Sequence, residues 1–134
     1  MADAIRVDIN LAATGGDQFV PLYYKAFDGQ RDKVRHLYRD TSAILWNGNA
    51  YSGIEPFEAM YKKMPTSEHT VETFDCHPLP TSSQGTPGSI IVNVSGSVTY
   101  GDDKQKKFFS QSFILSPDAS NGSFFIWSDN FRHI

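Results

Sequence analysis

The sequence is poor in cysteine and in positive charge, and each shortage excludes a class of protein. Its single cysteine, Cys76, permits no internal disulfide, which is typical of a protein from a reducing compartment. The formal net charge is -3, whereas a general nucleic-acid binder usually carries a basic face. The sequence therefore indicates neither a disulfide-stapled secreted domain nor a protein that holds nucleic acid on a basic surface.

Long apolar runs are missing as well. The first ten residues contain no apolar segment of the kind found in a signal peptide. No stretch approaches the roughly 20 apolar residues that a membrane-spanning helix needs, so we expect no membrane association. Hydrophobic residues still make up 40% of the 134 residues, which is enough for a packed core. We predict a single domain over residues 1–134.

Recognisable catalytic and metal-binding motifs are absent from the sequence. No two of the 4 histidines stand at helical spacing from one another, and there is no C-x-x-C, so we expect no metal. Neither a G-x-S-x-G nor a phosphate-cradling glycine loop occurs, so we expect no cofactor. What remains is acid–base chemistry by scattered residues that could line a pocket, namely Tyr24, Asp28, His36, Asp40 and His69. We predict that the protein is not an enzyme, and keep a small isomerase or dehydratase as an alternative.

The first half of the chain reads as helical. Phe19, Tyr23 and Phe27 recur at helical spacing, with Asp28-Gly29 as a stop signal. Pro21 removes a backbone donor, so we expect a kink or break near residue 17. A short second helix should follow, and the capping-box pattern of residues 52–55 predicts a third helix that ends at Pro65.

The rest of the chain has the pattern of strands. Asn47-Gly48 is a strong hairpin signal, and residues 81–89, rich in Ser, Thr, Gly and Pro, predict an exposed loop. The predicted strands cover residues 41–46, 49–52, 68–78, 89–100, 107–116 and 124–134. Helices first and a meander after predict an α+β fold, with about three helices packed on one face of a curved, mainly antiparallel sheet.

Period-two alternation divides the later strands into two faces. In the last strand, Phe125, Trp127, Asp129 and Phe131 are predicted to face one way, and Phe124, Ile126, Ser128, Asn130 and Arg132 the other. The face predicted to lie away from the helices carries small hydroxyls, amides, a few aliphatics and one arginine. A face with few charges and an arginine anchor is typical of a protein interface, although a plain solvent-facing sheet remains the other interpretation.

Several segments together resemble the nuclear transport factor 2 family. The most specific combination is Tyr23-Tyr24 with Phe27-Asp28, the later Trp46, and the terminal Asp129-x-Phe131-Arg132. The resemblance runs nearly end to end through the remaining segments, namely residues 37–48, 52–53, 75–78, 96–98 and 109–115. It implies a cone of three helices on a curved sheet that dimerises through the sheet.

Within this family the chain is similar to the export branch. It has Trp46-Asn47-Gly48-Asn49 where the import branch has an acid directly after the tryptophan. Asp102 and Asp103 do lie in the turn where the import branch also has acids, so some binding to Ran remains an alternative. The import branch is a homodimer that carries the GDP-bound form of the small GTPase Ran.

The export resemblance implies a set of partners and a site. The expected partner is the large mRNA export receptor, which contributes a domain of the same fold. Phenylalanine-glycine repeats of nuclear pore proteins are expected to bind through the complex, and RNA only indirectly, in a protein that shuttles between nucleus and cytoplasm. The resemblance places Arg132 opposite an acid of the partner, with Asp75 as a second charged contact. The predicted interface residues are Arg132, Asn130, Ser128, Asn93, Ser95, Ser112, Ile114 and Asp75.

Overall fold

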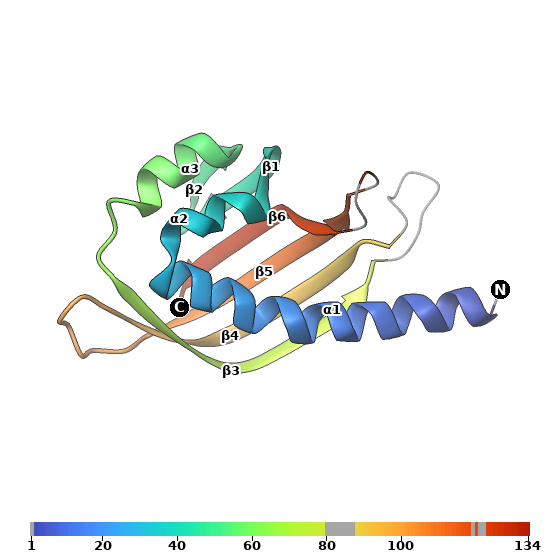
Figure 1. Cartoon of the computed structure of the whole chain (residues 1–134). Helices are drawn as coiled ribbons and strands as arrows, with labels where there is room; N and C mark the ends of the chain where they lie inside the picture. Colours follow the sequence, from blue (N-terminus) through green and yellow to red (C-terminus); the bar gives the residue numbers. More distant parts are fainter. Residues whose placement is uncertain (1, 80–87, 119, 121–122) are drawn as a thin grey trace.

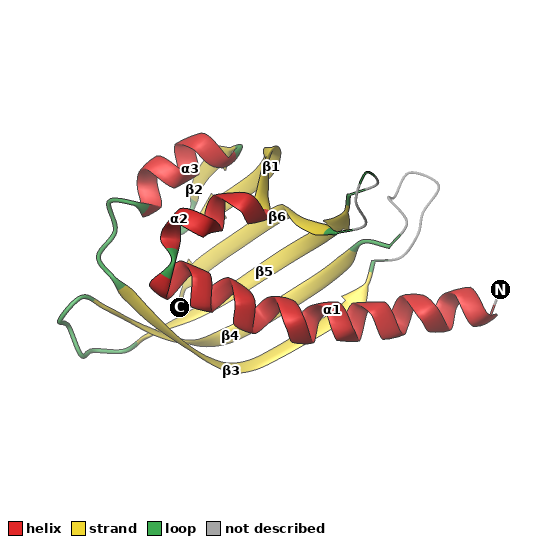
Figure 2. Ribbon diagram, viewed as in Figure 1, coloured by secondary structure: helices red, strands yellow, loops and turns green. Residues whose placement is uncertain are grey.

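Three helices cover one face of a six-stranded sheet (Figures 1 and 2). The computed structural model describes residues 2–79, 88–118, 120 and 123–134, with side chains from residue 15 onward. The loop predicted over residues 81–89 lies mostly outside these described residues. The helices are α1 (Ala2–Gly29), α2 (Arg31–Val34) with a 3-10 turn η1 (Arg35–Leu37), and α3 (Ile54–Tyr61). The strands are β1 (Tyr38–Trp46), β2 (Asn49–Ser52), β3 (Ser67–Pro78), β4 (Ile90–Tyr100), β5 (Lys107–Pro117) and β6 (Phe124–His133).

Helix α1 is continuous, so the predicted break near residue 17 is wrong. Pro21 lies inside the helix, which runs from Ala2 to Gly29, and its ring is on the exposed side. Gly16 allows close packing between α1 and β3, because a Cβ atom at this position would lie only 2.1 Å from the Cys76 sulfur on β3. Glycine therefore lets α1 approach the sheet closely, and packing of the aromatic stripe on the sheet outweighs the weak local helix propensity.

The third helix begins without the predicted capping box. Ser52 is still the last residue of β2, and Gly53 is the N-cap, with no side-chain hydrogen bond to the helix. Gly53 has φ +84°, and a Cβ atom there would lie 2.7 Å from the Asp40 carbonyl oxygen. Its N–H donates to the Ser42 carbonyl, so the sharp strand-to-helix turn is fixed by glycine and by β1.

The sheet is mixed, because β1 runs parallel to β6 while all other neighbouring strands are antiparallel. The strand order is β2-β1-β6-β5-β4-β3. The hairpin predicted at Asn47-Gly48 is confirmed, with φ 49° and 84° at the two residues. The chain thus places its last strand at the centre of the sheet, between β1 and β5.

Aromatic side chains fill the space between helices and sheet. Trp46 and Phe131 stack with ring centroids 4.0 Å apart, and Phe27 also stacks with Trp46 at 5.5 Å. Phe57 and Tyr61 from α3 complete this group, and both are fully buried. Among the described helices, none combines the length and apolar character needed to cross a bilayer.

The alternation predicted for β6 fails at a bulge. Ile114 pairs with Ser128 and Leu115 with Ile126, so Trp127 has no partner of its own on β5. The extra residue reverses the phase: Ile126 is buried, whereas Trp127 is 50% exposed. Downstream of the bulge the prediction is confirmed, with Asp129 and Phe131 buried and Asn130 and Arg132 exposed.

Candidate functional site: the open face of the sheet

Opposite the helices, the sheet presents an open face whose side chains stand in rows across the strands. The strand register aligns Asp75, Asn93, Ser112 and Asn130 and extends the row to Leu45 on β1. Within this row the Ser112 hydroxyl donates to the Asn93 side-chain oxygen. These hydroxyl and amide groups can both donate and accept hydrogen bonds, so the middle of the face is chemically adaptable.

A second row contains Arg132. The register aligns Thr73, Ser95, Ser110 and Arg132, and the hydroxyls of Thr73 and Ser95 lie 2.7 Å apart. Arg132 lies beside the hairpin turn, where a Cβ atom on Gly48 would be 3.4 Å from its Nη1. Its side chain is exposed, and within the described ranges it forms no ion pair. No described acid therefore neutralises the charge of this arginine.

The third row is apolar. Ile91, Ile114, Ser128 and Ala43 are aligned across β4, β5, β6 and β1. Large exposed side chains stand among the rows: Trp127 at 50%, Phe108 at 54% and Leu45 at 39% exposure. Large apolar groups surrounded by small polar ones are the composition of the core of a protein interface.

The open face thus contains every predicted interface residue, from Asp75 on β3 to Arg132 on β6. Sequence reasoning missed the three exposed apolar side chains. Phe108 and Leu45 follow from alternation, because each adjoins residues that point inward, namely Phe109, Ile44 and Trp46. Trp127 could not be found in this way, because no pattern in the sequence marks the bulge.

A buried polar network lies directly beneath the open face. The Tyr38 hydroxyl donates to Asp129 Oδ2 at 2.5 Å, and Gln111 Nε2 donates to Asp129 Oδ1 at 2.8 Å. Tyr24 donates to Gln111 at 2.7 Å, and the hydroxyls of Tyr23 and Tyr38 lie 3.0 Å apart. Burial raises the pKa of Asp129 to about 6, although hydrogen bonds from Gln111 and Tyr38 act in the opposite direction. The network fixes β6 against β5 and α1, and so holds the open face in place.

Three of the five predicted acid–base residues do come together. His69 Nδ1 lies 2.6 Å from Asp28 Oδ1, and the rings of Tyr24 and His69 are 5.1 Å apart, beside a cavity of about 540 Å³ between α1 and β3. Burial acts to raise the pKa of Asp28, but the hydrogen bonds from His69 and Ser67 prevail and lower it. His36 lies instead on η1 and Asp40 is exposed on β1. No group of three potential metal ligands occurs in the part of the chain that the structure describes.

A family model and a named human protein both match most of the chain. A family model described as the nuclear transport factor 2 (NTF2) domain matches residues 15–133. The human protein named NTF2-related export protein 2 is 32% identical over 126 residues, which cover 92% of this chain and 88% of that protein.

Solved structures with a similar fold include a nuclear transport factor 2 and an Mtr2-Mex67 complex. The structure of nuclear transport factor 2 from Cryptosporidium parvum has a TM-score of 0.78 and 31% identity, covering 89% of this chain and 91% of the other. The structure of the Candida albicans Mtr2-Mex67 M domain complex gives a TM-score of 0.74 at 15% identity, covering 91% and 94%. At that identity the likeness shows a shared fold.

Proposed function

Because the chain belongs to the nuclear transport factor 2 family, we propose that it is the non-catalytic small subunit of a heterodimeric mRNA export receptor. In this proposal its open face pairs with a domain of the same fold in the large subunit. The pair docks on phenylalanine-glycine repeats of nuclear pore proteins, mostly through the large subunit, and shuttles between nucleus and cytoplasm. RNA is reached through the large subunit, consistent with the net charge of -3 on this chain.

The observation that carries the proposal is the composition of the open face. It combines rows of hydroxyls and amides, three exposed apolar side chains, the exposed Asp75 on the edge strand β3, and one arginine that forms no ion pair with any described residue. A twofold axis through such a face would have to accommodate two copies of Arg132, whereas a different partner can supply an acid opposite it. The name of the human relative, an export protein, supports nuclear export as the process in which the chain acts.

The charge reversal Arg132→Glu tests the proposal. We expect it to weaken binding to the large subunit's domain by roughly 2–5 kcal/mol, because an interfacial charge pair becomes a repulsion. The thermal stability of the isolated chain should not change, since Arg132 has no ion-pair partner among the described residues. Titration calorimetry of each purified chain with the receptor domain from the same organism measures the affinity, and thermal melting of the isolated chain measures the stability.

The matched control for this experiment is Lys63→Glu, which makes the same charge change at an exposed residue in the turn after α3. Lys63→Glu should bind the receptor domain normally. Normal co-purification of Arg132→Glu would contradict the proposed role of the arginine. A tight homodimer of the native chain that ignores the receptor domain would contradict the heterodimer itself.

A homodimeric import carrier for GDP-bound Ran is the second candidate, favoured by the likeness to a nuclear transport factor 2 at 31% identity. Against it stands Asn47, whose side chain lies 3.0 Å from His133 Nδ1 and accepts from the His133 N–H at 2.8 Å. The residue after Trp46 is therefore engaged in tying the hairpin to β6. A pulldown with GDP-loaded Ran separates the candidates, and we expect little binding.

The small isomerase or dehydratase is the least supported reading. The Asp28–His69 pair beside a cavity is the arrangement that such an enzyme would use. The His69 side chain, however, is only 2% exposed, and its ring packs against Phe109 and Phe131 in the aromatic core. We therefore assign this pair to stability.

A further inference from the structure

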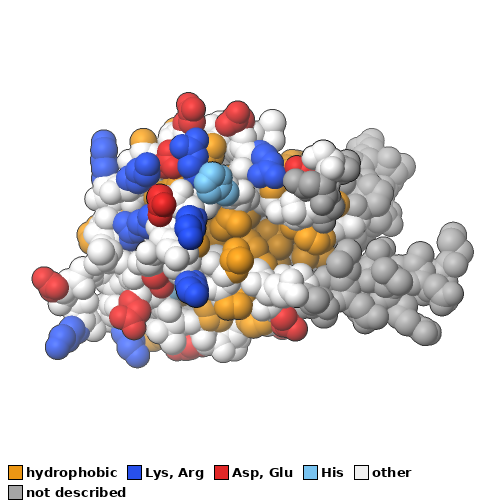
Figure 3. All heavy atoms as spheres, viewed as in Figure 1, with side chains coloured by type: hydrophobic (Ala, Val, Ile, Leu, Met, Phe, Trp, Pro, Cys, Tyr) orange, Lys and Arg blue, Asp and Glu red, His pale blue; other side chains and the backbone are white. Residues whose placement is uncertain are grey.

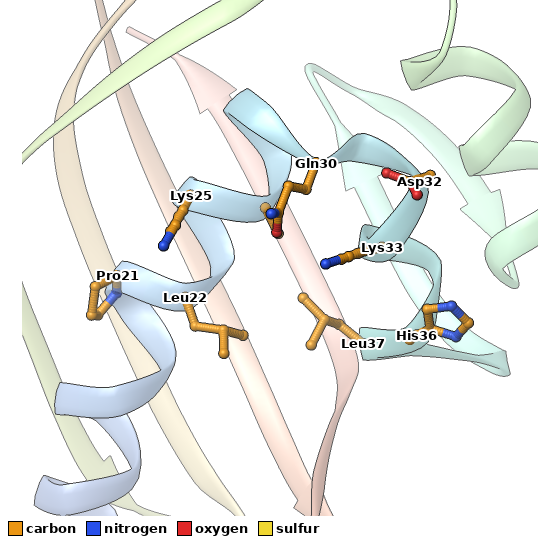
Figure 4. A pocket seen from close by; sticks show the side chains of 9 residues that line it. Pro21, Leu22, Lys25, Gln30, Asp32, Lys33, His36 and Leu37 are labelled. Carbon is orange, nitrogen blue, oxygen red and sulfur yellow. The ribbon is translucent and has the colours of Figure 1, made fainter.

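On the helix side, a groove of about 780 Å³ separates α1 from α2 and η1 (Figure 4). Its apolar lining consists of Pro21, Leu22, Ala26 and Leu37. Leu22 and Leu37 point toward one another across the groove, and Leu22 is 53% exposed. Figure 3 shows the corresponding apolar region on this side of the molecule, bordered by lysine, arginine and histidine side chains.

The rim of the groove is basic. Lys25 stands on α1 and Lys33 on α2, and Lys33 points into the gap between the two elements (Figure 4). Neither lysine forms an ion pair with a described residue, although three other cations on the surface do so with acids. Asp32 is the single acid in the lining. The groove therefore has an apolar floor and, on its rim, two lysines that no described acid neutralises.

We propose that this groove binds a short peptide segment of a partner protein, in which an apolar side chain is flanked by acidic residues. The apolar side chain would lie between Leu22 and Leu37, and the flanking carboxylates would meet Lys25 and Lys33. A small molecule fits less well, because ligand pockets enclose most of their ligand and orient it with inward-facing polar groups. Here the polar groups stand on the rim and the floor is aliphatic, which suits a chain that passes across the surface.

This site is separate from the proposed dimer interface. The groove is lined by residues of α1, α2 and η1. These helices cover one side of the sheet (Figure 1), and the open face lies on the other side. Occupying one therefore leaves the other accessible, and a peptide can bind whether the chain is paired or not. The inference consequently does not depend on the identity of the dimer partner.

The first experiment compares labelled peptides of ten residues by fluorescence anisotropy with the full chain. The probe carries a central Leu-Phe flanked by four glutamates, and its matched control replaces every glutamate with glutamine. We expect the acidic probe to bind at least about tenfold more tightly at low salt, and the difference to shrink at about 0.5 M salt, where charges are screened. Equal binding of the two peptides would overturn the charge requirement and, with it, the proposal.

Paired substitutions locate the binding site. Leu22→Ser should weaken binding of the acidic probe about tenfold or more, because it removes an apolar contact that the bound peptide would bury. Phe108→Ser is the matched control, since Phe108 is 54% exposed against 53% for Leu22 but lies on the open face. The combined change Lys25→Glu and Lys33→Glu should also weaken binding of the probe, whereas Lys63→Glu in the turn that follows α3 should not.

Two outcomes would overturn the assignment. One is an acidic probe that binds the Leu22→Ser chain as tightly as the native chain. The other is binding of the native chain to vesicles of anionic phospholipid that is lost in Leu22→Ser, which would make the groove a lipid site instead. Backbone amide chemical shifts that move at Ala26 and Leu37 on addition of the probe would support the peptide.

Discussion

The two faces of the sheet are built from alternate residues of the same strands, and they differ in composition. On β6, Phe131 is fully buried and stacks on Trp46, while the next residue, Arg132, is exposed and forms no ion pair with a described residue. The covered face is aromatic, and its polar atoms are paired with one another. The open face combines small polar side chains with a few large exposed apolar ones. Stability and recognition are thus assigned to alternate residues of one strand, and substitutions should separate them.

The largest effect is expected from Phe131→Ala on the covered face. Phe131 contacts the rings of Trp46, Phe109 and His69, so its removal leaves a cavity that those rings cannot fill. We expect a loss of about 3–5 kcal/mol in the free energy of unfolding. The neighbouring change Arg132→Ala should alter it by less than about 0.5 kcal/mol. Urea denaturation of both variants measures the contrast, and equal losses would contradict the division between the faces.

A smaller effect, on binding only, is expected from Trp127→Ala. The bulge in β6 leaves this ring 50% exposed among small polar neighbours, which is the setting of an interface hot spot. We expect at least about 2 kcal/mol of lost affinity for the proposed partner domain, or roughly 30-fold in Kd. The unfolding free energy of the isolated chain should stay nearly constant. Leu22→Ala removes an equally exposed apolar group from the helix side and should leave this affinity unchanged.

Trp127 also shows where prediction from the sequence ends. The strands, the Asn47-Gly48 hairpin and the open face were predictable, because alternation and turn chemistry are local signals. A bulge is a property of a strand pair: it appears only when Leu115 pairs with Ile126, and the sequence of β6 does not reveal it. Every apolar assignment upstream of the bulge is therefore reversed, including the placement of Ile126 on the open face.

The helices show a second reason why the sequence alone did not predict the whole structure. Gly16 and Pro21 both argue locally against a long helix, yet α1 runs from Ala2 to Gly29. The close contact of Gly16 with Cys76 is a tertiary requirement that no helix-propensity pattern contains. The groove between α1 and α2 was missed for the same reason, since its lining comes from elements whose relative placement only packing determines.

The finest test concerns the polar groups of the covered face. Asp129 is fully buried with its pKa raised to about 6, above the ordinary value of about 4 for an unfolded aspartate. The folded chain therefore binds a proton more tightly than the unfolded chain. The stability contributed by the protonated carboxyl is fully present below about pH 4 and is lost as the pH rises through about 6. Asp28 behaves in the opposite way, because its lowered pKa gives a contribution that is lost as the pH falls below about 4.

Two substitutions turn this difference into opposite slopes. The stability of the native chain relative to Asp129→Asn should fall by about 2 kcal/mol between pH 4 and pH 7, because asparagine does not titrate. Relative to Asp28→Asn, it should instead rise as the pH increases through the acidic range. Unfolding curves for the native chain and both variants across these pH values measure each difference. Parallel curves for the native chain and Asp129→Asn would mean that the carboxyl beneath the open face keeps its ordinary pKa. The network of Tyr38 and Gln111 would then accommodate the charged carboxylate as well as the protonated one.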